Sequence, residues 1–123
     1  MRNNFISIHH VSFIISDLKA AKDFYCKALG LQIDIARPEL SFEGLWLIIN
    51  QDQQIHLLLL NNPDSVTRPE HGGRDRHAAF KVRNFSEAKA RLDEHKIPYT
   101  VSKSGRQALF CRDPDGNTLE LIA

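Results

Sequence analysis

Residues 8–15, Ile-His-His-Val-Ser-Phe-Ile-Ile, alternate between the two faces of an extended chain. One face is apolar and the other is mixed: Val11, Phe13 and Ile15 against His10, Ser12 and Ile14. Apolar residues then recur at helical spacing from Leu18 to Leu29, with Ser16 expected as the N-cap and Gly30 as the stop. The pattern predicts a strand that leads into a helix.

The same order of elements occurs twice along the chain. Three short extended segments follow the first helix, at 31–36, 44–50 and 54–60, and a polar segment rich in Pro and Gly fills 61–75. The second half then predicts a strand at 76–82, a helix at 84–96 and three strands at 99–102, 107–112 and 118–122. Asn84 and Glu87 have the spacing of a capping box at the second helix. Each half therefore reads as βαβββ.

Weak internal sequence similarity supports the repeat. When His10 is set on His77, Phe13 falls on Phe80 at the same offset. When His56 is set on Glu120, the hairpin before each residue aligns without a gap. We therefore predict an α+β fold in which two tandem βαβββ modules, about 6–60 and 76–123, form a curved mixed sheet within one domain covering 1–123.

Composition narrows the class of partner. The 123 residues carry a formal net charge of +1 and are 42% hydrophobic, so a folded protein is expected and nucleic acid is disfavoured as a partner. No apolar run approaches the roughly 20 residues needed to cross a bilayer, so no membrane association is expected. Two cysteines and no recognisable signal sequence favour a cytosolic protein with reduced thiols.

Four polar side chains occupy the first and last strands of the two halves. They are His10, His56, His77 and Glu120. If the halves are related by approximate two-fold symmetry, their first and last strands are neighbours and these side chains can meet. Imidazole nitrogens and one carboxylate suit a borderline divalent ion such as Zn²⁺, Ni²⁺, Mn²⁺ or Fe²⁺. The sequence thus predicts a metal site with these four ligands, formed within one chain or between two.

Several motifs resemble the vicinal oxygen chelate superfamily, which includes glyoxalase I, fosfomycin-resistance thiol transferases, extradiol dioxygenases and bleomycin-binding proteins. The matching segments span nearly the whole chain: 10–18, Phe24-Tyr25, 29–31, 55–57, 76–80 and 110–121 with its Asp-Pro-Asp-Gly turn. The resemblance implies that His10, His77 and Glu120 are metal ligands. His56 stands where glyoxalase I enzymes usually have a carboxylate, so it is either a fourth ligand or a supporting group.

The resemblance also implies an activity. We expect a metal-dependent lyase, isomerase or thiol transferase that acts on a small oxygen-chelating substrate, with a thiol such as glutathione as a possible second substrate. Glu120, the one carboxylate of the predicted set, is the expected base. Members of the family commonly dimerise, so we expect a homodimer.

Basic side chains near the predicted site suggest an anionic substrate. Arg68, Arg74 and Arg76 lie close to His77 in the sequence, and forked guanidinium groups hold carboxylates or phosphonates well. A solvated loop in which Asp75 partners these arginines is the alternative. Lys103 and Arg106 form a second candidate anion clamp, and Trp46 is either core or a wall of the pocket.

Two other classes of function remain open from the sequence. His10, His77 and Glu120 form the two-His, one-carboxylate set of Fe²⁺ oxygenases, so an extradiol-type dioxygenase is one alternative. A non-enzymatic drug-binding module of the bleomycin-resistance kind is the other, although such modules generally lack the metal residues that this chain carries.

Overall fold

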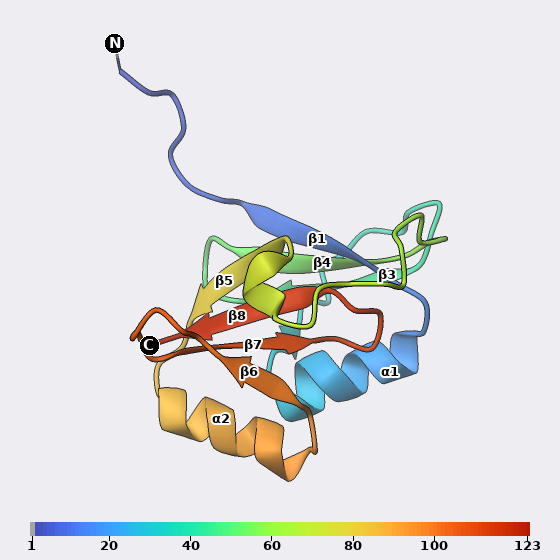
Figure 1. Cartoon of the computed structure of the whole chain (residues 1–123). Coiled ribbons are helices and arrows are strands. Elements are labelled where there is room, and N and C mark those ends of the chain that lie inside the picture. Colours follow the sequence, from blue (N-terminus) through green and yellow to red (C-terminus); the bar gives the residue numbers. More distant parts are fainter. Residues whose placement is uncertain (1) are drawn as a thin grey trace.

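A computed structural model describes residues 2–123 and confirms the repeated order of elements (Figure 1). The N-terminal module contains β1 (His10–Ile15), α1 (Leu18–Lys22), the π-helical segment η1 (Asp23–Ala28), β2 (Gln32–Ile33), β3 (Gly44–Ile48) and β4 (Gln54–Leu59). After the single turn η2 (Gly72–Arg74), the C-terminal module contains β5 (His77–Lys81), α2 (Phe85–Glu94), β6 (Tyr99–Val101), β7 (Ala108–Arg112) and β8 (Thr118–Ile122).

Each module forms its own four-stranded mixed sheet. The strand orders are β1-β4-β3-β2 and β5-β8-β7-β6, so the two sheets have the same topology. The first strand of each module pairs in parallel with the last, β1 with β4 and β5 with β8, and the other pairings are antiparallel. This confirms the predicted α+β fold and the predicted adjacency of first and last strands.

The helix ends show where local sequence signals hold. Asn84 caps α2 as predicted, because its side chain accepts a hydrogen bond from the Glu87 backbone N–H. The prediction of Ser16 as the first cap is wrong: Asp17 accepts from the Ala20 N–H at 3.0 Å, and the Ser16 N–H donates to Asp115 instead. A carboxylate one residue further along thus takes the capping position.

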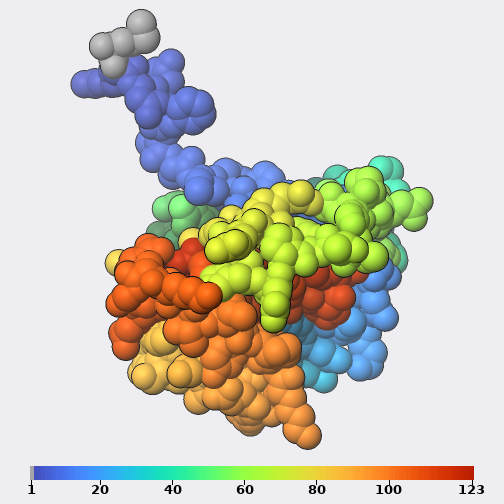
Figure 2. Space-filling view, in the orientation of Figure 1, coloured from blue at the N-terminus to red at the C-terminus, as the bar shows by residue number. Residues whose placement is uncertain are grey.

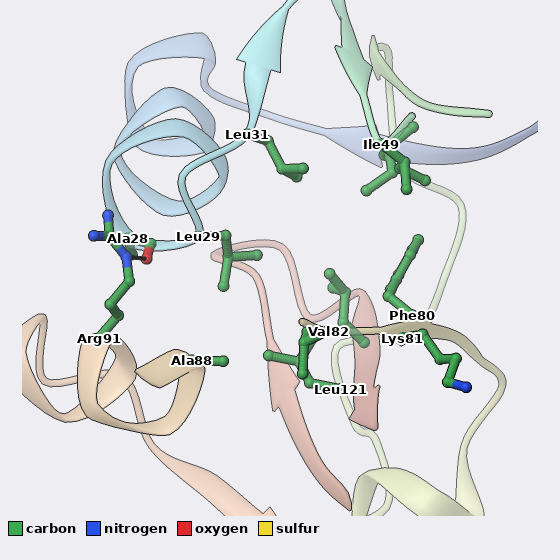
Figure 3. Close-up of a pocket in the computed structure, with 12 residues that line it drawn as sticks. Ala28, Leu29, Leu31, Ile49, Phe80, Lys81, Val82, Ala88, Arg91 and Leu121 are labelled. Carbon is green, nitrogen blue, oxygen red and sulfur yellow. Dashed lines mark hydrogen bonds between the residues drawn. The ribbon is translucent and has the colours of Figure 1, made fainter. Parts of the chain in front are cut away.

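The helices cover the apolar faces of the two sheets, and both lie on the same side in Figure 1. Tyr25 and Leu92, one from each helical layer, are fully buried in a continuous core that also receives side chains from the strands. Where the modules meet, apolar residues line a pocket of about 180 Å³, with Leu29, Phe80 and Ala88 among them (Figure 3). The core is therefore shared between the modules.

A hydrogen-bonded clasp joins the modules at the turn between β7 and β8. Asp113 accepts from the buried Tyr25 hydroxyl at 2.7 Å, and Asn117 Nδ2 donates both to Asp113 and to the Ile14 carbonyl oxygen. Gly116 adopts φ +86°, which the tight turn requires and a side chain would strain. The Asp-Pro-Asp-Gly turn thus fastens the C-terminal module to β1 and to η1.

Residues 2–7, ahead of β1, extend away from the body of the protein (Figure 2). Phe5 and Ile6 in this segment are 89% and 98% exposed. Among the helices in residues 2–123, none is long and apolar enough to cross a membrane.

Candidate functional site

The four predicted ligands occupy matching positions in the two modules. His10 opens β1 and His77 opens β5, whereas His56 and Glu120 are each the third residue of the last strand. Side chains alternate along a strand, so in each module both residues lie on the sheet face opposite the helices. The structure brings them together as two pairs, one on each sheet.

In the N-terminal module the pair is part of an aromatic stack. The His56 ring lies 3.9 Å from the His10 ring with 15° between their planes, and 4.4 Å from the Trp46 ring with 5° between the planes. Trp46 is the register partner of His56 on β3, so the sheet itself sets this contact. Trp46, predicted to belong to either the core or the pocket, is half-buried beneath His56.

Hydrogen bonds fix the orientation of the His56 ring. Its Nε2 contacts Gln54 Oε1 at 2.9 Å, and Gln54 Nε2 donates to Asp34 Oδ2 at 2.8 Å. An amide oxygen can only accept, so His56 Nε2 carries the hydrogen and Nδ1 the lone pair. Burial, with the nearby charges of His10, His9 and Arg37, lowers the pKa of His56 to about 4 despite the opposing Asp34. His56 is therefore neutral at pH 7.

The stack limits which rings can share an ion. A metal lies close to the plane of each imidazole that binds it, about 2 Å from the nitrogen. With their centroids 3.9 Å apart and 15° between their planes, the stacked His10 and His56 rings have planes that do not meet near either ring, so in this arrangement they cannot bind one ion together. The predicted four-ligand site would need one of these rings to turn.

In the C-terminal module His77 and Glu120 are in direct contact. His77 Nε2 lies 3.1 Å from Glu120 Oε1, and its Nδ1 lies 2.8 Å from the Asp75 carbonyl oxygen. Because the carbonyl only accepts, Nδ1 carries a hydrogen. Nε2 therefore either carries a proton toward Glu120 or directs a lone pair at a cation that both groups share. The lone pair of His77 Nε2 and the Glu120 carboxylate, with the ring orientation fixed, are suitable ligands for a divalent ion.

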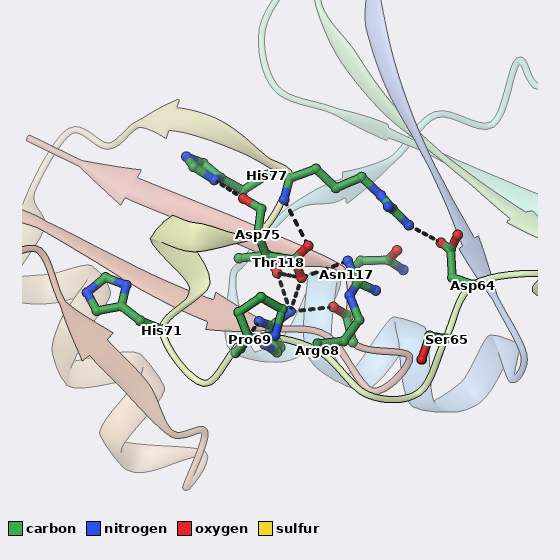
Figure 4. Close-up of polar contacts among 12 residues, drawn as sticks. Asp64, Ser65, Arg68, Pro69, His71, Asp75, His77, Asn117 and Thr118 are labelled. Carbon is green, nitrogen blue, oxygen red and sulfur yellow. Dashed lines mark hydrogen bonds and ion pairs between the residues drawn. The ribbon is translucent and has the colours of Figure 1, made fainter.

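A cluster of ion pairs surrounds Asp75, two residues before His77 (Figure 4). Asp75, whose side chain is 9% exposed, contacts Arg68 Nη2 at 2.7 Å and Arg112 Nη1 at 2.8 Å. Its carboxylate also accepts from the Arg76 backbone N–H. The hydrogen bond from Arg68, with help from Arg112, holds the pKa of Asp75 well below its usual range. Asp75 is thus an anion at all but strongly acidic pH.

The predicted anion-binding arginines have different surroundings. Arg68 pairs with Asp75 and Arg76 pairs with Asp64, which corresponds to the alternative of a loop whose own carboxylates partner its arginines. Arg106 Nη2 lies 3.4 Å from Glu120 Oε2, at the candidate base rather than at a separate clamp. No sequence signal pointed to Arg112, although its guanidinium contacts Asp75, Thr118 and the carbonyl oxygens of Pro69 and Gly116.

Arg74 and Lys103, predicted as parts of two separate clamps, line one groove. The groove, about 650 Å³, also includes His71, Thr100 and Val101. Within residues 2–123, neither cation pairs with a carboxylate and the buried Thr100 hydroxyl has no hydrogen-bond partner. His71 Nδ1 accepts from the Gly73 N–H, which leaves a donor on Nε2 of the neutral ring.

The groove adjoins the His77–Glu120 pair. The Phe110 ring contacts the His71 ring on one side and the His77 ring on the other, with ring centroids 5.2 Å and 5.1 Å apart. Phe110 is also the register partner of Glu120. In the part of the chain that the structure describes, no three His, Cys, Asp or Glu side chains gather as a cation site.

Comparison with known proteins identifies relatives over nearly the whole chain. Residues 7–121 match the model of the Glyoxalase/Bleomycin resistance protein/Dioxygenase superfamily. YwkD, an uncharacterised protein of Bacillus subtilis, is 36% identical over 122 residues that cover 94% of each chain. The catechol-2,3-dioxygenase of the same organism is 30% identical over 128 residues, and the match covers 94% of this chain but 41% of the dioxygenase.

Solved structures share the fold. A glyoxalase family protein from Enterococcus faecalis is 31% identical, with a TM-score of 0.67 and coverage of 97% of this chain and 98% of that one. A glyoxalase family protein from Bacillus anthracis is 24% identical, with a TM-score of 0.76 and coverage of 99% and 98%. The fosfomycin resistance protein FosX from Listeria monocytogenes is 16% identical, with a TM-score of 0.74 and coverage of 99% and 92%.

Proposed function

This chain belongs to the Glyoxalase/Bleomycin resistance protein/Dioxygenase superfamily, and from that membership we propose a divalent-metal-dependent enzyme that acts on a small, anionic, oxygen-chelating substrate. A lyase or isomerase reaction and a thiol transfer are the two forms of this proposal. The observation that carries it is the His77–Glu120 contact, in which the Asp75 carbonyl holds His77 Nδ1–H and turns Nε2 toward the carboxylate.

We assign His10, His77 and Glu120 as the ligands. The stacking of His56 on His10 favours this three-ligand version over the four-ligand one, with His56 acting as the wall that orients His10. Two imidazoles and one carboxylate leave coordination positions open for adjacent substrate oxygens. A bound divalent ion would supply Lewis-acid stabilisation of negative charge on one of those oxygens.

The chain's own residues would bind and deprotonate the substrate. Glu120 accepts a proton from the substrate carbon or thiol, and Arg106, 3.4 Å from it, balances its charge. The groove presents the cations of Arg74 and Lys103 beside the carboxylate of Glu70, and we assign it to the carboxylate or phosphonate end of the substrate.

We further propose that the site is shared between two subunits of a homodimer. The His10–His56 pair and the His77–Glu120 pair lie on different sheets, on the faces that the helices do not cover, so each would face a pair from a second copy. Apolar side chains that are almost fully exposed, such as Phe5, Ile6 and Ile35, provide surface that association would cover.

A mixing experiment tests the metal site and its sharing together. His10→Ala and Glu120→Ala each remove one ligand, and the bound Zn²⁺, Ni²⁺, Mn²⁺ or Fe²⁺ per chain is measured for each variant and for an equimolar mixture after subunit exchange. Random exchange makes half of the dimers mixed, and each mixed dimer regains one of its two sites. We therefore expect recovery of about a quarter of the wild-type metal content. His95→Ala, on the exposed end of α2, is the control with full content.

Three results would contradict parts of this proposal. Wild-type protein that binds no divalent metal would refute the metal site. Normal metal content in both variants would refute the ligand assignment. No recovery of metal binding in the mixture would refute the shared site. The shift in melting temperature caused by glutathione adducts, fosfomycin and simple phosphonates, measured at a fixed metal concentration, then identifies the substrate class. Ligand binding that is unchanged by a chelator would favour a drug-binding module.

An Fe²⁺ dioxygenase is the second candidate. The 30% identity to a catechol-2,3-dioxygenase favours it, although the chain spans less than half of that enzyme's length. His10, His77 and Glu120 are the same ligand types that this chemistry uses. Oxygen uptake in the presence of catechols and ferrous iron would support it, and its absence with iron bound would exclude it for those substrates.

A further inference from the structure

We propose that Asp75 is a positioning residue for His77: its ion-paired carboxylate fixes its own backbone carbonyl, which keeps the hydrogen on His77 Nδ1 and presents Nε2 to the ion. This inference rests on the proposed function for the role of Nε2, but the orientation itself is a property of the metal-free chain. It assigns Arg68 to holding the site's geometry, where the sequence suggested substrate binding.

The carboxylate of Asp75 is anchored from two sides. Arg68, from the same loop, and Arg112, from β7, contact its Oδ2 at 2.7 Å and 2.8 Å. The Arg68 and Asp75 side chains are only 14% and 9% exposed, so water screens this pair weakly. Its other oxygen accepts from the Arg76 N–H at 2.9 Å. Both oxygens of the Asp75 carboxylate are therefore held in place.

Arg112 links this anchor to the sheet that carries Glu120. Its guanidinium also donates to the carbonyl oxygens of Pro69 and Gly116 and to the Thr118 hydroxyl. Thr118 is the register partner of His77 and lies two residues before Glu120 on β8. The loop and β8 therefore meet at one cation, and the carbonyl of Asp75 is placed relative to the strand that holds Glu120.

The carbonyl of Asp75 then selects the hydrogen position on His77. At 2.8 Å from Nδ1 it accepts a hydrogen bond, which requires Nδ1–H. A histidine free of this contact would instead carry its hydrogen on Nε2 and donate it to Glu120, 3.1 Å away. That form would block the nitrogen that the ion needs. Partners of this kind to a ligand histidine are typically worth about 10–100-fold in metal affinity.

The experiment uses the full chain with ¹⁵N-labelled histidine, without metal, at about pH 8, where an ordinary histidine is neutral. Two-bond ¹H–¹⁵N correlation spectra show which His77 nitrogen carries the hydrogen, and competition with a chelating dye gives the Zn²⁺ dissociation constant. Asp75→Asn removes the charge with little change in shape. Asp64→Asn is the matched control, because it removes the loop's other ion pair, with Arg76, and leaves Asp75 intact.

We expect the wild type and Asp64→Asn to keep Nδ1–H and to bind Zn²⁺ within about two-fold of each other. Asp75→Asn should shift His77 to Nε2–H and weaken Zn²⁺ binding by about 10-fold or more. If Asp75→Asn fails to fold, Arg68→Gln leaves Asp75 with Arg112 alone and should give a partial shift in the same direction.

A wild-type His77 ring with a hydrogen on Nε2 and none on Nδ1, or unchanged His77 spectra in a folded Asp75→Asn or Arg68→Gln variant, would overturn the proposal. A changed tautomer without a change in Zn²⁺ affinity would overturn its functional part. If the tautomers are as expected but the wild type binds no metal, the metal site alone is refuted and the positioning role of Asp75 is still supported.

Discussion

Substituting His56 by phenylalanine should reduce the decrease in the free energy of unfolding that occurs between pH 8 and pH 5. Burial lowers the pKa of His56 from 6.5 to about 4, so between these pH values His56 is protonated in the unfolded chain and neutral in the folded one. The contribution of His56 to stability is therefore complete above 6.5 and is lost as the pH falls from 6.5 toward 4. At about 1.4 kcal/mol for each pKa unit, acidification to pH 5 costs about 2 kcal/mol.

Urea unfolding followed by far-UV circular dichroism, with a chelator present, measures this loss at equal protein concentrations. In His56→Phe the ring can still stack on Trp46 but cannot titrate, so the loss between pH 8 and pH 5 should be about 2 kcal/mol smaller than in the wild type. The hydrogen bond to Gln54 also disappears, which changes the absolute stability, so the dependence on pH is the measurement. His95→Gln, at an exposed position, should behave like the wild type. Equal losses in wild type and His56→Phe would refute the reasoning.

Two further predictions concern the region where the modules join. Tyr25→Phe removes a buried hydrogen bond to a carboxylate and should lower the free energy of unfolding by about 2 kcal/mol. The same change at half-buried Tyr99 should lower it by less than about 0.5 kcal/mol. Urea unfolding measures both. Ala88→Leu adds apolar atoms to the 180 Å³ pocket and should raise the melting temperature, an effect that Ala90→Leu on the exposed face of α2 should not share.

Periodic signals in the sequence were enough to predict the modules. The alternation around Val11 and its repetition after His77 predict strands directly, and the assumed two-fold symmetry between the halves predicted that first and last strands are neighbours. Asn84 was identified as a cap because the capping box is a local pattern. The choice of Asp17 over Ser16 was missed because both residues can cap, and only the contact of the Ser16 N–H with distant Asp115 separates them.

The sequence predicted a set of site residues but not the contacts that each of them makes. For Arg68 and Arg76 the sequence left substrate binding and pairing with Asp75 open, and its spacing gave no sign that Asp64 pairs with Arg76. The stack of His10 on His56 likewise depends on register across β1, β4 and β3. Contacts of this kind join residues far apart in the chain, so they follow from the tertiary structure alone. Which pairs complete one metal site, and in how many chains, stays a prediction.

Gly72 sits where loop 61–75 passes over the sheet, and a Cβ there would lie 2.8 Å from both Phe110 Cβ and Thr118 Cγ2. The backbone lies so close to the sheet that no side chain fits between them. In a library randomised over 70–74 and selected for folding, we expect glycine to be recovered at 72 while its neighbours tolerate many residues. New ligand preferences would then arise by exchanging His71 and Arg74, which line the groove, around one backbone position that cannot vary.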